Sequence, residues 1–490
     1  MSFADMALLT CRQMAAADAA AVQAGIPEFE LMLNAGRAVT DAINARWKPG
    51  RATVACGPGN NGGDGFVIAR LLQESGWAVR LALLGHVSNL PPAACAHAGQ
   101  WTGPVEALDR SLLQADLVVD ALFGAGLSRP LEGDAARWAS ALTETSIPVC
   151  AVDIPSGVSG DTGQALGLAA RADLTVTFFR KKIGHVLSPG RQFCGELVLA
   201  DIGIPAASLA DLDLSVAENH PGLWRSSLPQ AMVDQHKYHR GHVLVRGGDT
   251  LTGAARLSAL AAARTGAGLV TIAAPSAAWP VYAASLLSIM VQRCDDASTW
   301  STQLEDARIN SMVVGPGAGQ DVAAYALAAL GTARPVVLDA DALTAFADQP
   351  HRLFDAIKGP CVLTPHTGEF NRLFPAKEDN LDSDKLVRTQ RAARQSGAIV
   401  THKGSDTVIA HPDGRAIINT SGHPALATAG TGDVLTGMIA GFLAQGMDAF
   451  AAASAACWLH GQAGSLSGLG LIADDLPGLI PGLLQTLAHA

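Results

Sequence analysis

The sequence lacks any apolar segment long enough to cross a membrane as one helix, which takes about 18 uninterrupted residues. The nearest candidate, Val434–Leu459, is interrupted by Gln445 and Asp448 and is expected to form two buried helices instead. The N-terminus has no basic segment before an apolar core, so no signal peptide is expected. We therefore expect a cytoplasmic protein with no membrane partner.

The sequence also has no CxxC cysteine pair, few aromatic residues and no excess of positive charge. The 8 cysteines are scattered without a CxxC pair, which is typical of reduced thiols in the cytoplasm. Aromatic residues make up only 5% of the chain while Ala and Gly are abundant, which favours helices packed on sheets over a β-sandwich. The net charge of −10 argues against nucleic acid as a partner. With 490 residues, 49% of them hydrophobic, the chain is long enough for two or more domains.

A glycine-rich turn dominates the first half. The apolar strand Thr53–Cys56 runs into GPGNNGGDG (Gly57–Gly65), and a helix follows. The turn matches the dinucleotide fingerprint GxGxxG, but the second strand, Ala78–Leu84, ends in Gly85-His86 rather than in an acidic residue. The two Asn and the Asp make this turn more polar than a pyrophosphate turn requires. A polar ligand site and an ordinary tight turn between strand and helix both remain open.

Further polar residues follow other strands of this half. Asp120 ends one apolar strand, and Asp153 and Ser156 follow another. In open α/β sheets, ligands bind at the carboxyl ends of strands, so these residues and Asn61 are expected to meet in one crevice. Their oxygen atoms suit a hard cation, although each Asp could also be a turn residue.

The second half centres on Thr428–Gly437, with the sequence TAGTGDVLTG. The apolar residues after Asp433 have helical spacing, so Gly430-Thr431-Gly432 is expected at a helix N-terminus, where backbone N–H groups and the helix dipole favour an anion. A carboxylate repels a phosphate, so we interpret Asp433 as a base that takes a proton from an attacking hydroxyl. The alternative is an acidic residue that only complements the helix dipole.

Strands and helices alternate through this half, which predicts a doubly wound sheet. The expected strands are Val243–Arg246, Leu269–Ala273, Met312–Val314, Val336–Leu338, Cys361–Leu363 and Ile399–Thr401, with a hairpin of Thr407–Ala410 and Ala416–Asn419. Lys403 beside Gly404 could meet a phosphate, but no GxxxxGK[ST] motif is present, so this is not a P-loop protein.

The helix and strand periodicity of hydrophobic residues is lost over 206–232. This places the domain boundary there and predicts domains of 1–215 and 225–490.

Three histidines lie at spacing three in His236-Lys237-Tyr238-His239-Arg240-Gly241-His242. This spacing could indicate a metal site. Two cations and a Gly interrupt the histidines and no acidic ligand is near, so a basic loop before a strand is the favoured interpretation.

Two sets of motifs resemble known families. GNNGGDG, VDALFGAGL, AVDIPSG and TFFRKK, from about residue 10 to 215, resemble the NAD(P)H-hydrate epimerase domain, a Rossmann-like fold. Residues 236–485 resemble the ribokinase-like, ADP-dependent NAD(P)H-hydrate dehydratase, through HK, GGD…TGAA, GAGLV, GPGAG, DADAL, LTPHTGEF, HKGSDT and AGTGD. The fused order resembles the bifunctional bacterial enzyme of nicotinamide-nucleotide repair.

The first resemblance implies a site for the hydrated nucleotide, with potassium at its phosphate. The hydrate would be held by Asn60, Asn61, Gly62, Gly63, Asp64, Gly124, Ala125, Gly126, Leu127, Ser128, Arg129, Pro130 and Asp153. Potassium would be held by Asn61, Asp120 and Ser156. Asp153 would be the acid/base that interconverts the R and S hydrates at C6 of the reduced nicotinamide.

The second resemblance implies that ADP, with magnesium, drives removal of the hydrate water from the S form. Asp433 would be catalytic, and the hydrate would face Ala254, Gly319, His366 and Asp433. The nucleotide would be held by Lys403, Gly404, Ser405, Asp406, Thr407 and Gly432. The substrates would be the hydrates of NADH and NADPH (NADHX and NADPHX) together with ADP, and a homo-oligomer is expected.

Two alternatives stay open. A kinase for a small hydroxylated vitamin precursor would share the second fold and the Gly-Thr-Gly-Asp loop, but it would demand ATP and leave the phosphate on its product. The first domain could instead be a non-catalytic nucleotide-binding module that regulates the second.

Overall fold

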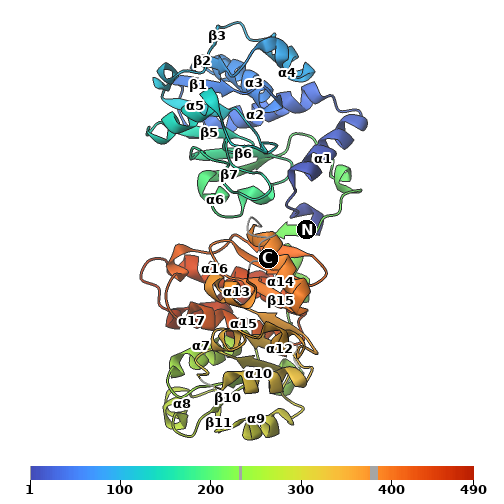
Figure 1. Cartoon of the computed structure of the whole chain (residues 1–490), viewed down its shortest axis with the longest axis vertical. Helices are drawn as coiled ribbons and strands as arrows, with labels where there is room; N and C mark the ends of the chain where they lie inside the picture. The colour runs from blue at the N-terminus through green and yellow to red at the C-terminus, as the bar shows by residue number, and fades with distance from the viewer. Residues whose placement is uncertain (1, 231–233, 320, 376–383, 490) are drawn as a thin grey trace. The chain divides into compact units, whose positions relative to one another are not determined.

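The computed structural model describes residues 2–230, 234–319, 321–375 and 384–489. It divides into two compact units, each described here by itself (Figure 1). One unit is Ala7–Leu214, and the other is Ser215–Ala490 together with Met1–Met6. The division falls inside the predicted boundary region, but the predicted domains 1–215 and 225–490 assign Met1–Met6 to the wrong side and leave out the residues before 225.

The first unit is built on a seven-stranded parallel sheet in the order β3-β2-β1-β4-β5-β6-β7. The strands are β1 (Arg51–Cys56), β2 (Ala78–Leu83), β3 (Val105–Glu106), β4 (Leu117–Ala121), β5 (Val149–Val152), β6 (Leu174–Phe178) and β7 (Glu196–Ala200). The strand order reverses between β1 and β4, and this is the point where open α/β sheets bind ligands at the carboxyl ends of their strands.

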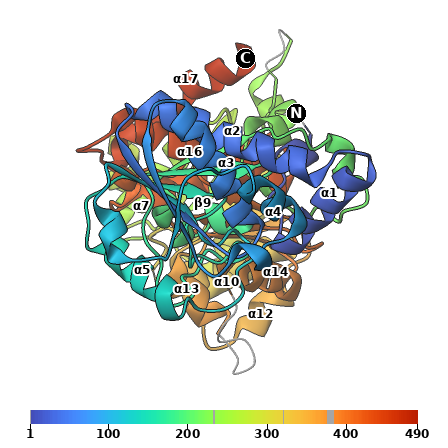
Figure 2. The ribbon, with the colours of Figure 1, turned by 90° about the horizontal axis from the view of Figure 1, so that it is seen from above.

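The helices of this unit are α1 (Cys11–Gln23), α2 (Glu28–Arg46), α3 (Asn60–Glu74), α4 (Pro92–Ala98), α5 (Gly133–Thr143) and α6 (Gly190–Phe193). α1 and α2 are separated at Gly25, whose φ is +96°, and α2 starts after Pro27. α2 and α3 pack closely (Figure 2), because a Cβ on Gly36 would lie 2.4 Å from a methyl carbon of Val67. Only glycine at this position allows that approach.

The second unit is built on a ten-stranded sheet in the order β11-β10-β9-β12-β13-β14-β15-β16-β17-β8. The strands are β8 (Val216–Glu218), β9 (His242–Arg246), β10 (Leu269–Ala274), β11 (Met290–Arg293), β12 (Ser311–Val314), β13 (Val336–Leu338), β14 (Cys361–Leu363), β15 (Ile399–His402), β16 (Thr407–Ala410) and β17 (Ala416–Asn419). β9 to β15 are mutually parallel, and β16 and β17 form the predicted antiparallel hairpin. β8 pairs with β17, although sequence periodicity gave no sign of it.

The helices of the second unit are α7 (Thr252–Arg264), α8 (Trp279–Ser285), α9 (Ala297–Leu304), α10 (Val322–Gly331), α11 (Asp341–Thr344), α12 (Pro350–Phe354), α13 (Thr367–Leu373), α14 (Lys385–Ser396), α15 (Thr431–Ala444), α16 (Ala449–Ser467) and α17 (Leu476–His489). The apolar stretch at 434–459 forms α15 and α16, two buried helices as predicted. Within the described residues, no helix is long and apolar enough to span a membrane.

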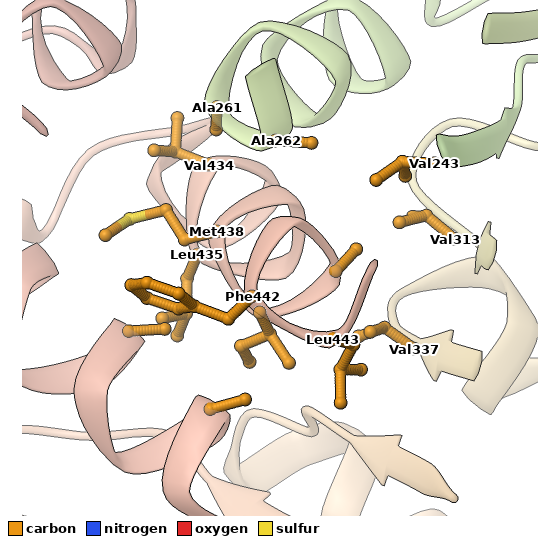
Figure 3. Packing of buried hydrophobic residues seen from close by; sticks show 14 of the residues in the cluster. Val243, Ala261, Ala262, Val313, Val337, Val434, Leu435, Met438, Phe442 and Leu443 are labelled. Atoms are coloured by element: carbon orange, nitrogen blue, oxygen red, sulfur yellow. The ribbon is translucent and has the colours of Figure 1, made fainter. Parts of the chain in front are cut away.

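α15 lies at the centre of the second core (Figure 3). Its apolar face packs under α7, where Ala261 and Ala262 are small enough to let the two helices approach. Gly437 on α15 allows the same approach, because a Cβ there would lie 2.1 Å from a backbone oxygen of α7. The N-terminal part of α15 lies at the carboxyl end of β13, because Thr436 Oγ1 donates to Asp339 Oδ2 at 2.8 Å.

Two candidate active sites

The first site is a cavity of about 950 Å³ at the switch point of the first sheet. Ten of the predicted residues line it: Asn60, Asn61, Asp64, Gly124, Ala125, Gly126, Leu127, Ser128, Arg129 and Asp153. Gly62, Gly63 and Pro130 are not among its lining residues. Gly62 instead allows a close backbone approach, since a Cβ there would lie 1.9 Å from the carbonyl oxygen of Gly57.

The Asp153 carboxylate accepts hydrogen bonds from three donors. Its Oδ1 accepts from Lys182 Nζ at 2.7 Å and from Thr177 Oγ1 at 3.0 Å, and its Oδ2 accepts from the Ala125 N–H at 2.8 Å. Burial raises the pKa of Asp153, but the Lys182 ammonium and His185 outweigh burial and bring it to about 2. Asp153 is therefore a fixed anion, in backbone with φ +67°, a conformation that few non-glycine residues adopt.

Asp120 and Ser156 form one buried oxygen cluster at the ends of β4 and β5. Ser156 Oγ donates to Asp120 Oδ1 at 2.7 Å, and the Ser156 N–H donates to Oδ2 at 2.9 Å. Burial raises the pKa of Asp120, since no cation is among the described groups that bond it. The Phe123 carbonyl lies 3.3 Å from Ser156 Oγ, and Asn61 Nδ2 is buried without a hydrogen-bond partner in the described part of the chain. The oxygen atoms of Asp120, Ser156 and the Phe123 carbonyl suit a hard cation such as potassium.

The second site is assembled around the N-terminus of α15. Gly430 has φ +90°, and the Thr431 hydroxyl donates to the Leu426 and Thr428 carbonyls at 2.9 and 3.1 Å, which fixes the turn. Gly432 lies close to the Lys403 ammonium, since a Cβ there would be 3.3 Å from Lys403 Nζ. The backbone N–H groups of the first turn of α15 are thus open to an anion.

Asp433 differs from Asp153 in its ionisation. Burial raises the pKa of Asp433 to about 7, and the nearby Asp339 carboxylate adds to this shift while Lys403 opposes it. A carboxyl that titrates near neutral pH can both accept and return a proton, as a general base must.

A buried ion pair supports this site. Lys403 Nζ, on the loop after β15, donates to Asp339 Oδ1 at 2.8 Å, and Thr436 Oγ1 donates to Asp339 Oδ2 at 2.8 Å. Burial lowers the pKa of Lys403, but Asp339 outweighs it, so the pKa is raised. Glu369 on α13 shares this environment, and its pKa is raised by burial and by Asp339.

The other predicted residues of the second site have distinct surroundings. His366 is exposed, with its Nε2 3.4 Å from Glu369 Oε1, and the Gly319 N–H donates to Asp341 Oδ2 at 3.0 Å. Ala254 is half-buried at the start of α7. In the predicted nucleotide loop, Gly404 and Ser405 are exposed while Asp406 and Thr407 are buried. Asp406 is engaged by Lys385 at 2.6 Å, and Thr407 Oγ1 donates to the Gly404 carbonyl at 2.9 Å; both buried residues thus shape the loop.

The histidines that could have indicated a metal do not converge. His236 stacks on His239, while His242 Nε2 lies 2.8 Å from Thr271 Oγ1 inside the sheet. Among the described residues, no group of three or more His, Cys, Asp or Glu could hold a metal ion. Lys237–Arg240 form a short 3-10 helix before β9 rather than the predicted basic loop, and His242 is the first residue of β9.

Sequence reasoning missed several site residues: Asp18, Thr177, Lys182, Asp339, Glu369 and Thr436. In the sequence, Lys182 stood out only as one cation of the TFFRKK segment, and Asp339 only as a polar residue at the end of a strand. Their side-chain partners are 29 and 64 residues away in sequence, and no local pattern identifies such pairs.

Comparison with known proteins identifies both units. A family model described as YjeF-related protein N-terminus matches residues 28–184, and one described as NAD(P)H-hydrate dehydratase matches residues 242–470. The bifunctional NAD(P)H-hydrate repair enzyme Nnr of Moorella thermoacetica is 36% identical over 516 residues, covering 98% of this chain and 97% of that enzyme. The chain belongs to the bifunctional NAD(P)H-hydrate repair enzymes.

Other relatives agree with this assignment. The Nnr enzyme of Coxiella burnetii is 35% identical, over 95% of this chain and 96% of that enzyme. The crystal structure of ADP/ATP-dependent NAD(P)H-hydrate dehydratase from Bacillus subtilis, with ATP and Mg²⁺, is 32% identical with a TM-score of 0.50, over 55% of this chain and 98% of that one. A ribokinase-like protein of Enterococcus faecalis, 25% identical, also has a TM-score of 0.50. The predicted fold class is confirmed.

Proposed function

We propose that the chain carries out both reactions of its family, one in each unit. The first unit interconverts the R and S hydrates of NADH and NADPH, and the second removes water from the S hydrate at the expense of ADP, giving AMP and phosphate. Asp433 carries this assignment, because a carboxyl with a pKa near 7 lies within the first turn of α15, beside backbone groups open to a phosphate.

In the second unit, Asp433 takes the proton of the C6 hydroxyl as that oxygen attacks the terminal phosphoryl group of ADP. Phosphate then leaves C6, a proton leaves C5, and the C5–C6 double bond of the nicotinamide is restored. Lys403 and the N–H groups at Gly432 hold phosphate oxygens, and the exposed Gly404-Ser405 loop receives the rest of the nucleotide. Magnesium, when bound, would screen the charge of the phosphates.

In the first unit, Asp153 acts in its ionised form beside C6, held by Lys182 and the Ala125 N–H. Asn61, Asp120 and Ser156 would hold potassium, which lowers the repulsion between the substrate phosphate and the carboxylates of the site. The loop of Gly124–Pro130 would close over the nucleotide. We further expect a homo-oligomer, which molar-mass measurement in solution would test.

The test is to mix hydrated NADH with ADP or with ATP and follow the return of nicotinamide absorbance. We expect recovery with ADP, and full recovery of an R and S mixture because the first unit supplies the S form. A vitamin-precursor kinase would instead leave the hydrate unchanged and place a phosphate on its own substrate. Recovery that stops after the S form is consumed would identify the first unit as a binding module.

A further inference from the structure

Asp18 on α1 is an unused carboxyl in the first cavity. It lines the same wall as Asp153 and Lys182, and its side chain is half-buried. Within the described residues, it has no hydrogen-bond or ion-pair partner. Asp153, by contrast, already accepts from three donors and keeps its negative charge. The cavity therefore presents the saturated Asp153 anion together with two carboxyls, Asp18 and Asp64, that burial favours in the protonated form.

The charged groups around Asp18 come from several elements. Lys182 follows β6, Asp153 follows β5, Glu28 starts α2, and Asp64 belongs to α3. Burial raises the pKa of Asp18 to about 6, with Asp153 and Glu28 adding to the shift and Lys182 opposing it. Pairs of carboxyls whose surroundings separate their pKa values in this way commonly divide acid and base roles.

We propose that Asp18 is the proton donor of epimerisation, and that it works opposite the Asp153 anion. This inference rests on the proposed function of the first unit. The Asp18 O–H protonates the C6 hydroxyl, the C6–O bond breaks, and water leaves as the ring-nitrogen lone pair forms a nitrogen–C6 double bond. The Asp153 carboxylate stabilises this cation.

The reverse step completes epimerisation without any other reactant. Water adds to C6 from the opposite face, the electron pair returns to the ring nitrogen, the proton of the added water passes to solvent, and the Asp18 carboxylate takes a proton back from solvent. The epimer and the protonated Asp18 are both regenerated. One consequence is that each epimerised molecule exchanges its C6 oxygen with solvent.

The experiment measures epimerisation of the pure R hydrate by the full chain in water labelled with oxygen-18, across pH 5 to 9, with the spontaneous rate subtracted. For the wild type we expect one oxygen-18 per epimerised molecule, and kcat/KM that falls as pH rises through about 6, because the donor must be protonated. Asp18→Asn should lower the rate by about a hundredfold or more and abolish this pH dependence. Asp18→Glu should restore part of the rate together with the falling limb.

Two controls separate this proposal from folding and from the proposed function. Asp41→Asn makes the same charge change on an exposed face of α2 and should leave epimerisation unchanged. Dehydration of the S hydrate should be unaffected in every variant, which shows that the second unit is intact, and an unchanged thermal unfolding transition of the first unit shows that this unit is folded. Epimerisation by Asp18→Asn within about threefold of wild type with an unchanged pH profile, or epimerisation without oxygen-18 uptake, would overturn the role of Asp18. A wild type that does not epimerise would instead refute the proposed function.

Discussion

The two candidate sites use the same pair of electrostatic elements. Each has a buried Lys–Asp ion pair at the carboxyl edge of a parallel sheet, Lys182–Asp153 at 2.7 Å and Lys403–Asp339 at 2.8 Å. Each also has a second carboxyl whose pKa burial raises towards neutrality, to about 6 for Asp18 and about 7 for Asp433. In both sites, a fixed anion thus accompanies a group that can exchange a proton.

The difference lies in what surrounds the proton-exchanging carboxyl. Asp433 is in the first turn of a helix, next to Gly432 and Lys403, so proton transfer there occurs beside groups that stabilise a phosphate. Asp18 is in the middle of α1 and lines the same cavity as the Asp153 anion, which suits a cationic intermediate instead. The surroundings of the carboxyl, more than the carboxyl itself, decide which reaction each site can support.

The comparison is tested most directly by Asp153→Asn and Asp433→Asn. Each keeps the size of the side chain and removes the charge, and loss of the general base Asp433 should cost about a hundredfold to ten-thousandfold in rate. We expect Asp433→Asn to abolish dehydration while ADP still binds, and Asp153→Asn to stop epimerisation with substrate still bound. The assays are NADH recovery from the S hydrate, conversion of the R hydrate, and calorimetric titration of each ligand.

Each of these variants serves as the control for the other, because each leaves the other unit intact. Dehydration by Asp433→Asn within about threefold of wild type would exclude Asp433 as the base. If Asp153→Asn consumes the R hydrate at the wild-type rate, the first unit is a binding module.

The next prediction is that the two units fold independently of one another. Fragment 7–214 should fold alone and equilibrate the two hydrates without ADP. Fragment 215–490 should be soluble, whereas 225–490 should be strongly destabilised, because it lacks β8 and with it Asn219, whose Nδ2 donates to Asn419 Oδ1 at 2.9 Å and to the Ser454 carbonyl at 2.8 Å. Losing these bonds and an edge strand should cost on the order of 4 kcal/mol.

Soluble expression and urea unfolding of the three fragments check this prediction. Equal stability of 215–490 and 225–490 would show that β8 is dispensable to the second sheet. A 7–214 fragment that is folded yet inactive would count against epimerisation by the first unit rather than against the boundary.

Asp120→Ala should have a smaller effect that is confined to the first site. It removes the carboxylate that both Ser156 groups bond, so substrate binding should weaken by about tenfold to a hundredfold and the potassium dependence of epimerisation should disappear. Initial rates with potassium or sodium as the only monovalent cation measure this, with Asp41→Ala as the exposed control. Unchanged potassium dependence would place the cation elsewhere.

The site loops were predictable from sequence and their electrostatic partners were not. Gly57–Gly65 and Thr428–Gly437 stand out because glycines directly after a strand or before an apolar helical run are a local signal. Lys182 and Asp18 became visible only when folding brought distant elements together. β8 was missed because a strand of three residues has no measurable periodicity.

The smallest expected effect is on stability, and it should have opposite signs in the two units. Asp433 has a pKa of about 7 in the folded chain and about 3.9 unfolded, so the folded state retains a proton that the unfolded state loses between these values. Its stabilisation is complete below pH 4 and is lost as pH rises to 7. Asp153, with a pKa of about 2, instead stabilises above pH 4, and that contribution is lost as pH falls towards 2.

Asn cannot ionise, so each substitution removes the corresponding pH dependence. Asp433→Asn should therefore stabilise the second unit relative to wild type at pH 8, by on the order of 2 kcal/mol, and much less at pH 4.5. Asp153→Asn should destabilise the first unit at pH 8, because Lys182 is left buried without its partner. Calorimetric Tm values at both pH values test this; equal signs at pH 8 would mean that the pKa values of the two carboxyls are not shifted in opposite directions by folding.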